Sequence, residues 1–360
     1  MKFNLKPKTT LQPKNYIGLK IAAIYGSIFL GAGFASGQEL MQYFAYFGRL
    51  GLFGIMIAGL LFAFTGWAVL RICKREGLEN YHQLMCYLFG PKFGKLMECM
   101  VSIFLFCLLV AMLAGAGATG HEAFGFSFSL SALITALLVF FVLCFGLNGI
   151  VKINLYLAPF MLLGGIFIGL FSFFTYARPV FAILSAGTLT IAWILSAVIY
   201  ASYNLVTGVP ILAAVSKIAT TKKDAMIGGL LGGGIITLVG ICMVLPIFLH
   251  YTTVIRLEIP FLYIAAYHGD IFRLFYLAVL IAAIITTAAC NAFAVSEWLK
   301  AQGFSGKIKI AAVICIAALV FSHIGFSNIV AYVYPAFGFL GLFKIIVVLW
   351  HGFCYTKASS

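Results

Sequence analysis

The chain has 360 residues, of which 64% are hydrophobic and 9% charged, and its formal net charge is +14 at pH 7. Soluble proteins are on average roughly 45–50% apolar and about 25% charged. The composition therefore excludes a soluble globular domain and indicates a polytopic membrane protein. The lysines lie in short segments between apolar runs, which argues against nucleic acid as a partner.

Apolar runs in chain order predict ten membrane-spanning helices joined by short loops, an all-α polytopic fold. Most runs have the ~20 residues that a bilayer requires. The predicted spans are roughly 17–46, 49–70, 95–119, 130–147, 151–175, 187–215, 226–249, 271–299, 308–322 and 327–350.

Lysine and arginine are distributed unevenly over the two sides of this predicted bundle. With the N-terminus inside, eighteen lie on the inner side and four on the outer side. Lys344 lies within the last span, and its long side chain can extend toward the inner surface. The positive-inside rule then predicts a multi-pass protein of the bacterial plasma membrane with cytoplasmic tails at 1–16 and 351–360.

Two segments, 24–33 (IYGSIFLGAG) and 199–208 (IYASYNLVTG), have the same residue at five of ten positions. Their offset of 175 residues also carries the second to fifth predicted spans onto the seventh to tenth. The sequence therefore predicts two five-helix repeats, 17–175 and 187–350. Because five is odd, the second repeat would be inverted in the membrane, as in many secondary transporters.

Helix-breaking and polar residues occupy the middle of two predicted spans. The first span contains GAGFASGQE (31–39), and a break at bilayer depth is tolerated where it lines a cavity. Close helix packing is the alternative use of such small residues. The sixth span contains SAVIYASYNLVTGVP (196–210), in which Pro210 removes a helix bond. We expect both spans to be discontinuous; the alternative for the sixth is a proline kink with polar side chains bonded to their own helix.

Glu39 has two interpretations. Ser36 and Glu39 have the S-x-x-E spacing of a capping box, in which Glu39 would bond the backbone of Ser36. Alternatively, Glu39 binds a cationic group or carries a proton, since intramembrane carboxylates are costly and usually functional. Together with a half-helix N-terminus, which attracts carboxylates, it would suit a zwitterion. The predicted substrate-binding residues are Phe29, Gly31, Ala32, Gly33, Ser36, Glu39, Tyr200, Ser202 and Asn204.

With ten spans, the repeat and GAGFASGQE, the chain resembles the YkvI-type bacterial membrane proteins. That group is placed with the amino-acid permeases of the amino acid–polyamine–organocation superfamily, with the fold of the sodium-coupled leucine transporter. The resemblance covers essentially the whole chain. It implies a sodium site between the first and eighth spans, to which Ser27 and Leu30 would give backbone carbonyls.

The eighth span would complete this sodium site with the Ala283 carbonyl and the hydroxyls of Thr286 and Thr287. Positions i+3 and i+4 share a helix face, although both threonines could instead bond their own helix. Proton-coupled relatives place a lysine in the middle of the fifth span. This chain departs from that pattern, because the only lysine in its predicted fifth span is Lys152, at the cytoplasmic end, and this favours sodium.

The sequence therefore predicts a secondary active transporter that couples sodium to the symport of a small amino acid or amine by alternating access. Proton coupling through Glu39 and a non-transporting nutrient sensor are the alternatives. We expect no enzymatic activity, because no catalytic triad, phosphate loop or metal-binding spacing occurs. No cofactor besides the coupling ion is expected. The expected partners are the lipid bilayer and the small-molecule substrate, with the chain a monomer or homodimer.

Overall fold

A computed structural model describes residues 16–29, 31–145, 163–172, 174 and 191–354, and these residues form helices without strands. The α-helices are α1 (Tyr16–Ile28), α2 (Ala32–Ser36), α3 (Gln38–Tyr43), α4 (Arg49–Glu76), α5 (Tyr81–Phe124), α6 (Phe128–Phe145), α8 (Ala192–Val215), α9 (Lys222–Leu249), α10 (Tyr251–Val254), α11 (Pro260–Tyr267), α12 (Asp270–Ala301), α13 (Lys307–Ser322), α14 (Phe326–Asn328) and α15 (Tyr334–Cys354). Leu163–Ser172 is also helical. Short 3₁₀ turns at Ala45–Phe47 and Ser216–Ile218 and a π-helical turn at Ile329–Val333 complete the regular structure of the described residues.

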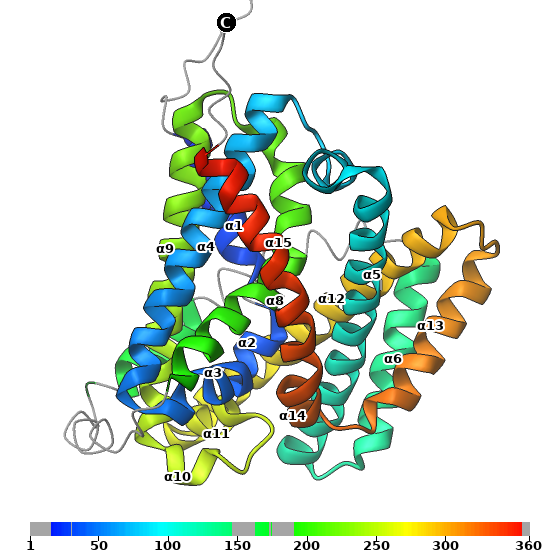
Figure 1. Ribbon diagram of the computed structural model, residues 1–360. Helices are drawn as coiled ribbons and strands as arrows, with labels where there is room; N and C mark the ends of the chain where they lie inside the picture. Colours follow the sequence, from blue (N-terminus) through cyan, green and yellow to red (C-terminus); the bar gives the residue numbers. More distant parts are fainter. Residues whose placement is uncertain (1–15, 30, 146–162, 173, 175–190, 355–360) are drawn as a thin grey trace, which may run out of the picture.

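The long helices form a bundle in which partners distant in sequence lie side by side (Figure 1). Helix α9 packs against α1 and α4, α15 packs against α8, and α5 packs against α6 and α12. The short helices α10 and α11 lie at one end of the bundle, which we call the α10–α11 end. The start of α1 and the end of α15 lie toward the opposite end.

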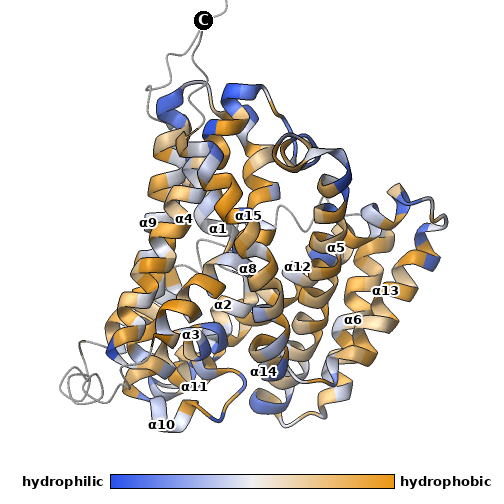
Figure 2. Cartoon of the chain, in the orientation of Figure 1, coloured by the Kyte–Doolittle hydropathy of each residue, from blue (hydrophilic) through white to orange (hydrophobic). Residues whose placement is uncertain are grey.

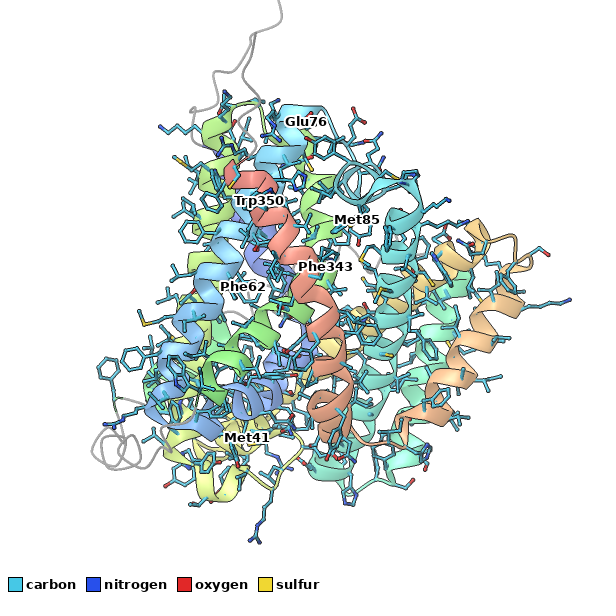
Figure 3. The ribbon with its side chains drawn as sticks, in the orientation of Figure 1. Met41, Phe62, Glu76, Met85, Phe343 and Trp350 are labelled. Atoms are coloured by element: carbon cyan, nitrogen blue, oxygen red, sulfur yellow. The ribbon has the colours of Figure 1, made fainter. Side chains whose placement is uncertain are left out.

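The surface of the bundle is that of a membrane protein. Six described helices, α4, α5, α8, α9, α12 and α15 with its preceding turns, are long and apolar enough to cross a bilayer. Hydrophilic residues gather at the two ends of the bundle, with hydrophobic residues between them (Figure 2). Large apolar side chains such as Phe343 and Trp350 are 57% and 63% exposed on α15 (Figure 3). The chain is therefore a multi-pass membrane protein.

Each of the ten predicted spans overlaps a described helix, although most of the fifth, 151–175, lies outside the described residues. The all-helical class is confirmed, whereas the count of ten, the inverted repeat and the orientation of the termini stay predictions. Helix α5 begins fourteen residues before its predicted span. It bends at Gly90, whose φ of 77° only glycine adopts readily, directly before Pro91.

The predicted break in the first span is confirmed. Helix α1 ends at Ile28 and α2 begins at Ala32, so the helix is interrupted around Gly31. A second interruption follows at Gly37, which separates α2 from α3 with a φ of 81°. This left-handed conformation favours glycine, which has no Cβ to clash with the backbone.

The predicted discontinuity of the sixth span is wrong, because α8 is one continuous helix from Ala192 to Val215. Its polar side chains bond within the helix: Asn204 Nδ2 donates to the Tyr200 carbonyl (3.0 Å), and Thr207 Oγ1 donates to the Asn204 carbonyl (2.9 Å). The alternative interpretation, a helix that contains a proline and back-bonded side chains, is the correct one.

A lysine from another helix compensates for the proline in α8. Pro210 has no N–H group, so the carbonyl four residues earlier, that of Val206, loses its helical donor. Lys344 Nζ of α15 donates a hydrogen bond of 3.2 Å to this carbonyl. Lys344 is 2% exposed, so its side chain does not extend to the inner surface as we expected from the sequence. This bond explains how α8 continues past Pro210.

Candidate functional site

Glu39 is a buried carboxylate beside the interrupted first span. It lies in the first turn of α3 and is 6% exposed. Its Oε2 accepts a hydrogen bond of 2.7 Å from the Tyr203 hydroxyl of α8. Among the described residues, no lysine, arginine or histidine forms an ion pair with it. A buried charge is costly unless it is paired and hydrogen-bonded, so this carboxylate is suited to receive a cation or a proton.

Gly33 provides the space that the Glu39 carboxylate occupies. A Cβ atom added to Gly33 would lie 2.1 Å from Glu39 Oε1, closer than any real contact. The interruption therefore brings together two residues that the sequence predicted for one site.

The predicted capping box is not formed. The residue that precedes α3 is Gly37, which has no side chain to cap the helix. Ser36 Oγ instead donates to the Gly33 carbonyl (2.7 Å) and accepts from the Gln38 backbone N–H (3.1 Å). Since Glu39 bonds Tyr203 rather than the backbone of Ser36, the capping interpretation of Glu39 is wrong.

Four tyrosines, Tyr43, Tyr200, Tyr203 and Tyr334, form a cluster of buried rings around the Glu39–Tyr203 bond. Tyr203 is central, with ring centroids 5.4, 5.5 and 4.9 Å from those of Tyr43, Tyr200 and Tyr334. The sequence interpretation missed Tyr43, Tyr203 and Tyr334. The three-residue spacing of Tyr200 and Tyr203 could have indicated Tyr203, because it places both on one face of a helix.

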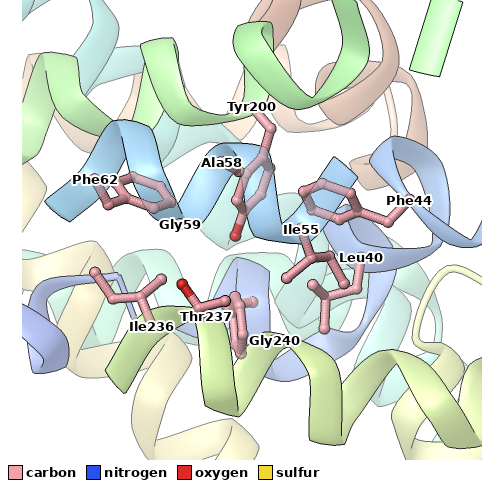
Figure 4. Close-up of a pocket in the computed structure, with 11 residues that line it drawn as sticks. Leu40, Phe44, Ile55, Ala58, Gly59, Phe62, Tyr200, Ile236, Thr237 and Gly240 are labelled. Atoms are coloured by element: carbon pink, nitrogen blue, oxygen red, sulfur yellow. The ribbon is translucent and has the colours of Figure 1, made fainter. Parts of the chain in front are cut away.

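Several polar groups near this cluster have no partner among the described residues. They are the hydroxyls of Tyr200, Tyr334 and Ser202, all buried. The Tyr200 ring extends from α8 toward Thr237 of α9 into a small, mostly apolar pocket (Figure 4). That pocket, bordered also by Phe34 of α2, has a volume of about 10 Å³, which is near the space of one water molecule.

The other predicted substrate-binding residues occupy different surroundings. Phe29 is 5% exposed, and its ring packs on Phe62 with a centroid distance of 4.7 Å. Ala32 is buried at the start of α2. The Asn204 amide is occupied within α8, as described above. Phe29 and Ala32 thus pack in the core of the interrupted region.

The residues predicted to bind sodium are partly brought together. A Cβ atom added to Gly31 would lie 3.8 Å from Thr287 Oγ1, so α12 contacts the interruption. Thr286 Oγ1 donates to the carbonyls of Ala282 (2.9 Å) and Ala283 (3.1 Å).

The predicted contributions from the first span to the sodium site are placed only in part. Ser27, predicted to give its backbone carbonyl, lies in α1 one residue before the helix ends, whereas Leu30 lies outside the described residues. The sodium site therefore stays a prediction that rests on the α12 side.

A wide pocket at the α10–α11 end is lined in part by Gln38, the residue that precedes Glu39 in α3. Its volume is about 440 Å³, and its lining includes Gln38, Gln42, Glu258 and Ser327. Gln38 Nε2 donates to Ser327 Oγ (2.9 Å), and Gln42 Nε2 donates to the Ser327 carbonyl (3.1 Å). These bonds tie α3 to α14 along the lining of the pocket.

Solved membrane proteins share this fold. The chain matches MhsT in complex with L-phenylalanine with a TM-score of 0.67 at 14% identity, over 94% of this chain and 89% of MhsT. It matches inward-facing Mhp1 with a TM-score of 0.65 at 14% identity, over 92% and 76%. It matches the manganese transporter of Eremococcus coleocola with a TM-score of 0.63 at 15% identity, over 93% and 78%. The fold is thus one that membrane transport proteins use.

Two relatives in Bacillus subtilis (strain 168) are similar along most of their length, and no protein-family model matches the chain. The membrane protein YkvI is 28% identical over 327 residues, which cover 90% of this chain and 92% of YkvI. YyaD is 27% identical over 338 residues, which cover 91% and 94%. The resemblance to YkvI-type membrane proteins is confirmed.

Proposed function

We propose that the protein is a secondary active transporter and that its substrate is a small amino acid or amine whose ammonium group binds Glu39. The observation that carries this proposal is the Glu39 carboxylate, buried at a helix interruption and without a cationic partner among the described residues. An ammonium group there would be bound by a charge-assisted hydrogen bond, which is stronger than a neutral one.

The surroundings of Glu39 support a small substrate. The tyrosine cluster would provide ring faces, which attract cations. The hydroxyls of Tyr200 and Tyr334, which have no partner among the described residues, would bond polar groups of the substrate. The adjoining pocket beside Tyr200 has a volume of about 10 Å³ and would admit a small apolar side chain only after repacking. The L-phenylalanine in the MhsT structure supports an amino acid as the substrate class.

Access from the α10–α11 end would require movement of α3 relative to α14. The bonds from Gln38 and Gln42 to Ser327 would have to break before a substrate in the wide pocket could reach Glu39. In alternating access, a corresponding path would open toward the opposite end.

Sodium at the Gly31–Thr287 contact would supply the driving force for uptake. Moving one charge across ~100 mV gives about 2.3 kcal/mol, and a tenfold sodium gradient gives about 1.4 kcal/mol more. Their sum would support roughly several-hundred-fold accumulation. Proton coupling through Glu39 is the second candidate, because the same lack of a cationic partner favours protonation.

The test is uptake into proteoliposomes, preceded by a thermal-shift screen of amino acids and amines with and without sodium. A compound that raises Tm should then accumulate only when a sodium gradient is imposed. Accumulation driven by a proton gradient alone would replace sodium by the proton. A compound that binds without any uptake would indicate the nutrient sensor, and conversion of a compound to a product would indicate an enzyme.

A further inference from the structure

Lys344 is a buried cation without a carboxylate partner. It is 2% exposed, and its Nζ donates to the Val206 carbonyl. All nine aspartate and glutamate residues of the chain lie among the described residues, and none forms an ion pair with Lys344. An ammonium group has three N–H donors. The Val206 carbonyl accepts from one of them. The positive charge and the other N–H donors of the ammonium group therefore call for an acceptor that carries negative charge.

Tyr81 supplies a second buried donor in the same place. Its ring centroid lies 5.6 Å from Lys344 Nζ, and its buried hydroxyl has no hydrogen-bond partner among the described residues. Both side chains line one cavity of about 20 Å³ between α5, α8 and α15. The rest of its lining is mostly apolar and includes Met97, Val101 and Phe337.

We propose that Lys344 and Tyr81 bind a small monovalent anion, chloride, in this cavity. Both side chains offer hydrogen-bond donors, and an anion accepts from both. It also neutralises the ammonium charge, which a water molecule does not, and uncompensated charge is costly in a buried setting. The volume suits a single small ion or water molecule and is too small for an amino-acid carboxylate with its backbone. This site does not depend on the transport function proposed above.

The test measures thermal unfolding of the purified full-length protein at constant sodium concentration and ionic strength, with gluconate replaced stepwise by chloride. The wild-type Tm should rise and saturate with chloride, because a ligand that binds the native state stabilises it. Lys344→Gln keeps an N–H donor for Val206 but removes the charge, and its Tm should not respond. Tyr81→Phe keeps the ring but removes the hydroxyl, and its apparent chloride affinity should fall roughly tenfold, the loss of one hydrogen bond to a charged group.

Lys300→Gln is the matched control, since Lys300 is a partly exposed lysine paired with Glu297 at 2.6 Å. The Tm of this variant should rise with chloride as that of the wild type does. A wild-type Tm that is the same in gluconate and chloride would overturn the proposal. So would an unchanged chloride response in Lys344→Gln. If Lys344→Gln does not fold, Tyr81→Phe decides: wild-type chloride affinity in that variant also rejects the site.

Discussion

The Glu39 carboxylate accepts a hydrogen bond of 2.7 Å from the Tyr203 hydroxyl, across 164 residues of sequence. This bond joins the interrupted first span to the continuous α8. It also excludes the capping interpretation of Glu39, since a carboxylate bonded to Tyr203 is not a helix cap. The remaining carboxylate oxygen faces Gly33 in α2, two residues after Gly31.

Removing the charge of Glu39 tests its role in binding. Glu39→Gln keeps the size and can still accept from Tyr203, but it cannot pair with an ammonium group. A hydrogen bond to a charged group contributes about 1.5–3 kcal/mol, so substrate affinity should fall roughly ten- to a hundredfold. Isothermal titration with the compound identified by thermal shift measures this. Glu297→Gln, a change at a partly exposed ion pair, should bind normally.

Binding by Glu39→Gln within about threefold of wild type, with an unchanged pH profile, would give Glu39 a structural role. A changed pH dependence without loss of affinity would instead favour proton coupling.

Gly33 should tolerate no side chain if the Glu39 carboxylate must keep its position. In Gly33→Ala the new Cβ would meet Glu39 Oε1 at 2.1 Å. Because that atom is the end of a flexible side chain, we expect the protein to fold while the carboxylate is displaced. Substrate affinity should fall at least tenfold, measured by titration, with a smaller effect on Tm.

The control for Gly33→Ala is Gly234→Ala in α9, where an added Cβ would meet nothing within 4 Å. That variant should bind normally, and its Tm should stay level or rise, since alanine favours helix by about 1 kcal/mol over glycine. Equal behaviour of the two variants would contradict the role of Gly33.

The first break was predictable, and Glu39 could be singled out as a candidate, because their signals are local. Three glycines and a carboxylate inside an apolar run are anomalous by composition alone. The same local reasoning failed for α8. Its polar residues and Pro210 suggested a break, but two side chains bond their own helix and Lys344 supplies the missing donor. Sequence spacing does not reveal a partner 138 residues away.

The tyrosine cluster beside Glu39 illustrates the same limit. Tyr203 and Tyr334 come from helices that only the tertiary fold brings beside α3, and a tyrosine in a membrane span is otherwise unremarkable. The sodium residues differ, since their i, i+3, i+4 spacing on one helix is local. The assignment of these residues to sodium combined that spacing with a family resemblance, and it stays a prediction.

Replacing Thr286 and Thr287 by Ala and Val, respectively, should remove sodium-dependent stabilisation. Both changes keep helix α12 apolar, and Thr286 Oγ1 donates to the carbonyls of Ala282 and Ala283 in that same helix. We therefore expect a folded protein whose Tm no longer rises when choline is replaced by sodium. A full sodium response in the double variant would exclude this site, and a wild type that responds to pH but not to sodium would favour the proton.

The link between Pro210 and Lys344 can be measured with a double-mutant cycle. Pro210→Ala restores an N–H group that can donate to the Val206 carbonyl within α8. Lys344→Met removes the lysine donor and leaves that carbonyl unsatisfied when Pro210 is present, at a cost of about 1–3 kcal/mol. The same substitution should cost less in the Pro210→Ala background, because the carbonyl then has its helical partner.

The quantity to compare is the change in unfolding free energy for Lys344→Met in the two backgrounds, from chemical denaturation in detergent. Loss of the buried charge contributes equally to both and cancels in the cycle. We expect a coupling of about 1 kcal/mol or more, with Pro210→Ala partly rescuing Lys344→Met. Unconnected sites add within about 0.3–0.5 kcal/mol, so additivity at that level would mean that the Lys344 bond does not compensate for the proline. Rescue would show that a lysine on α15 holds α8 continuous where its own sequence favours a break.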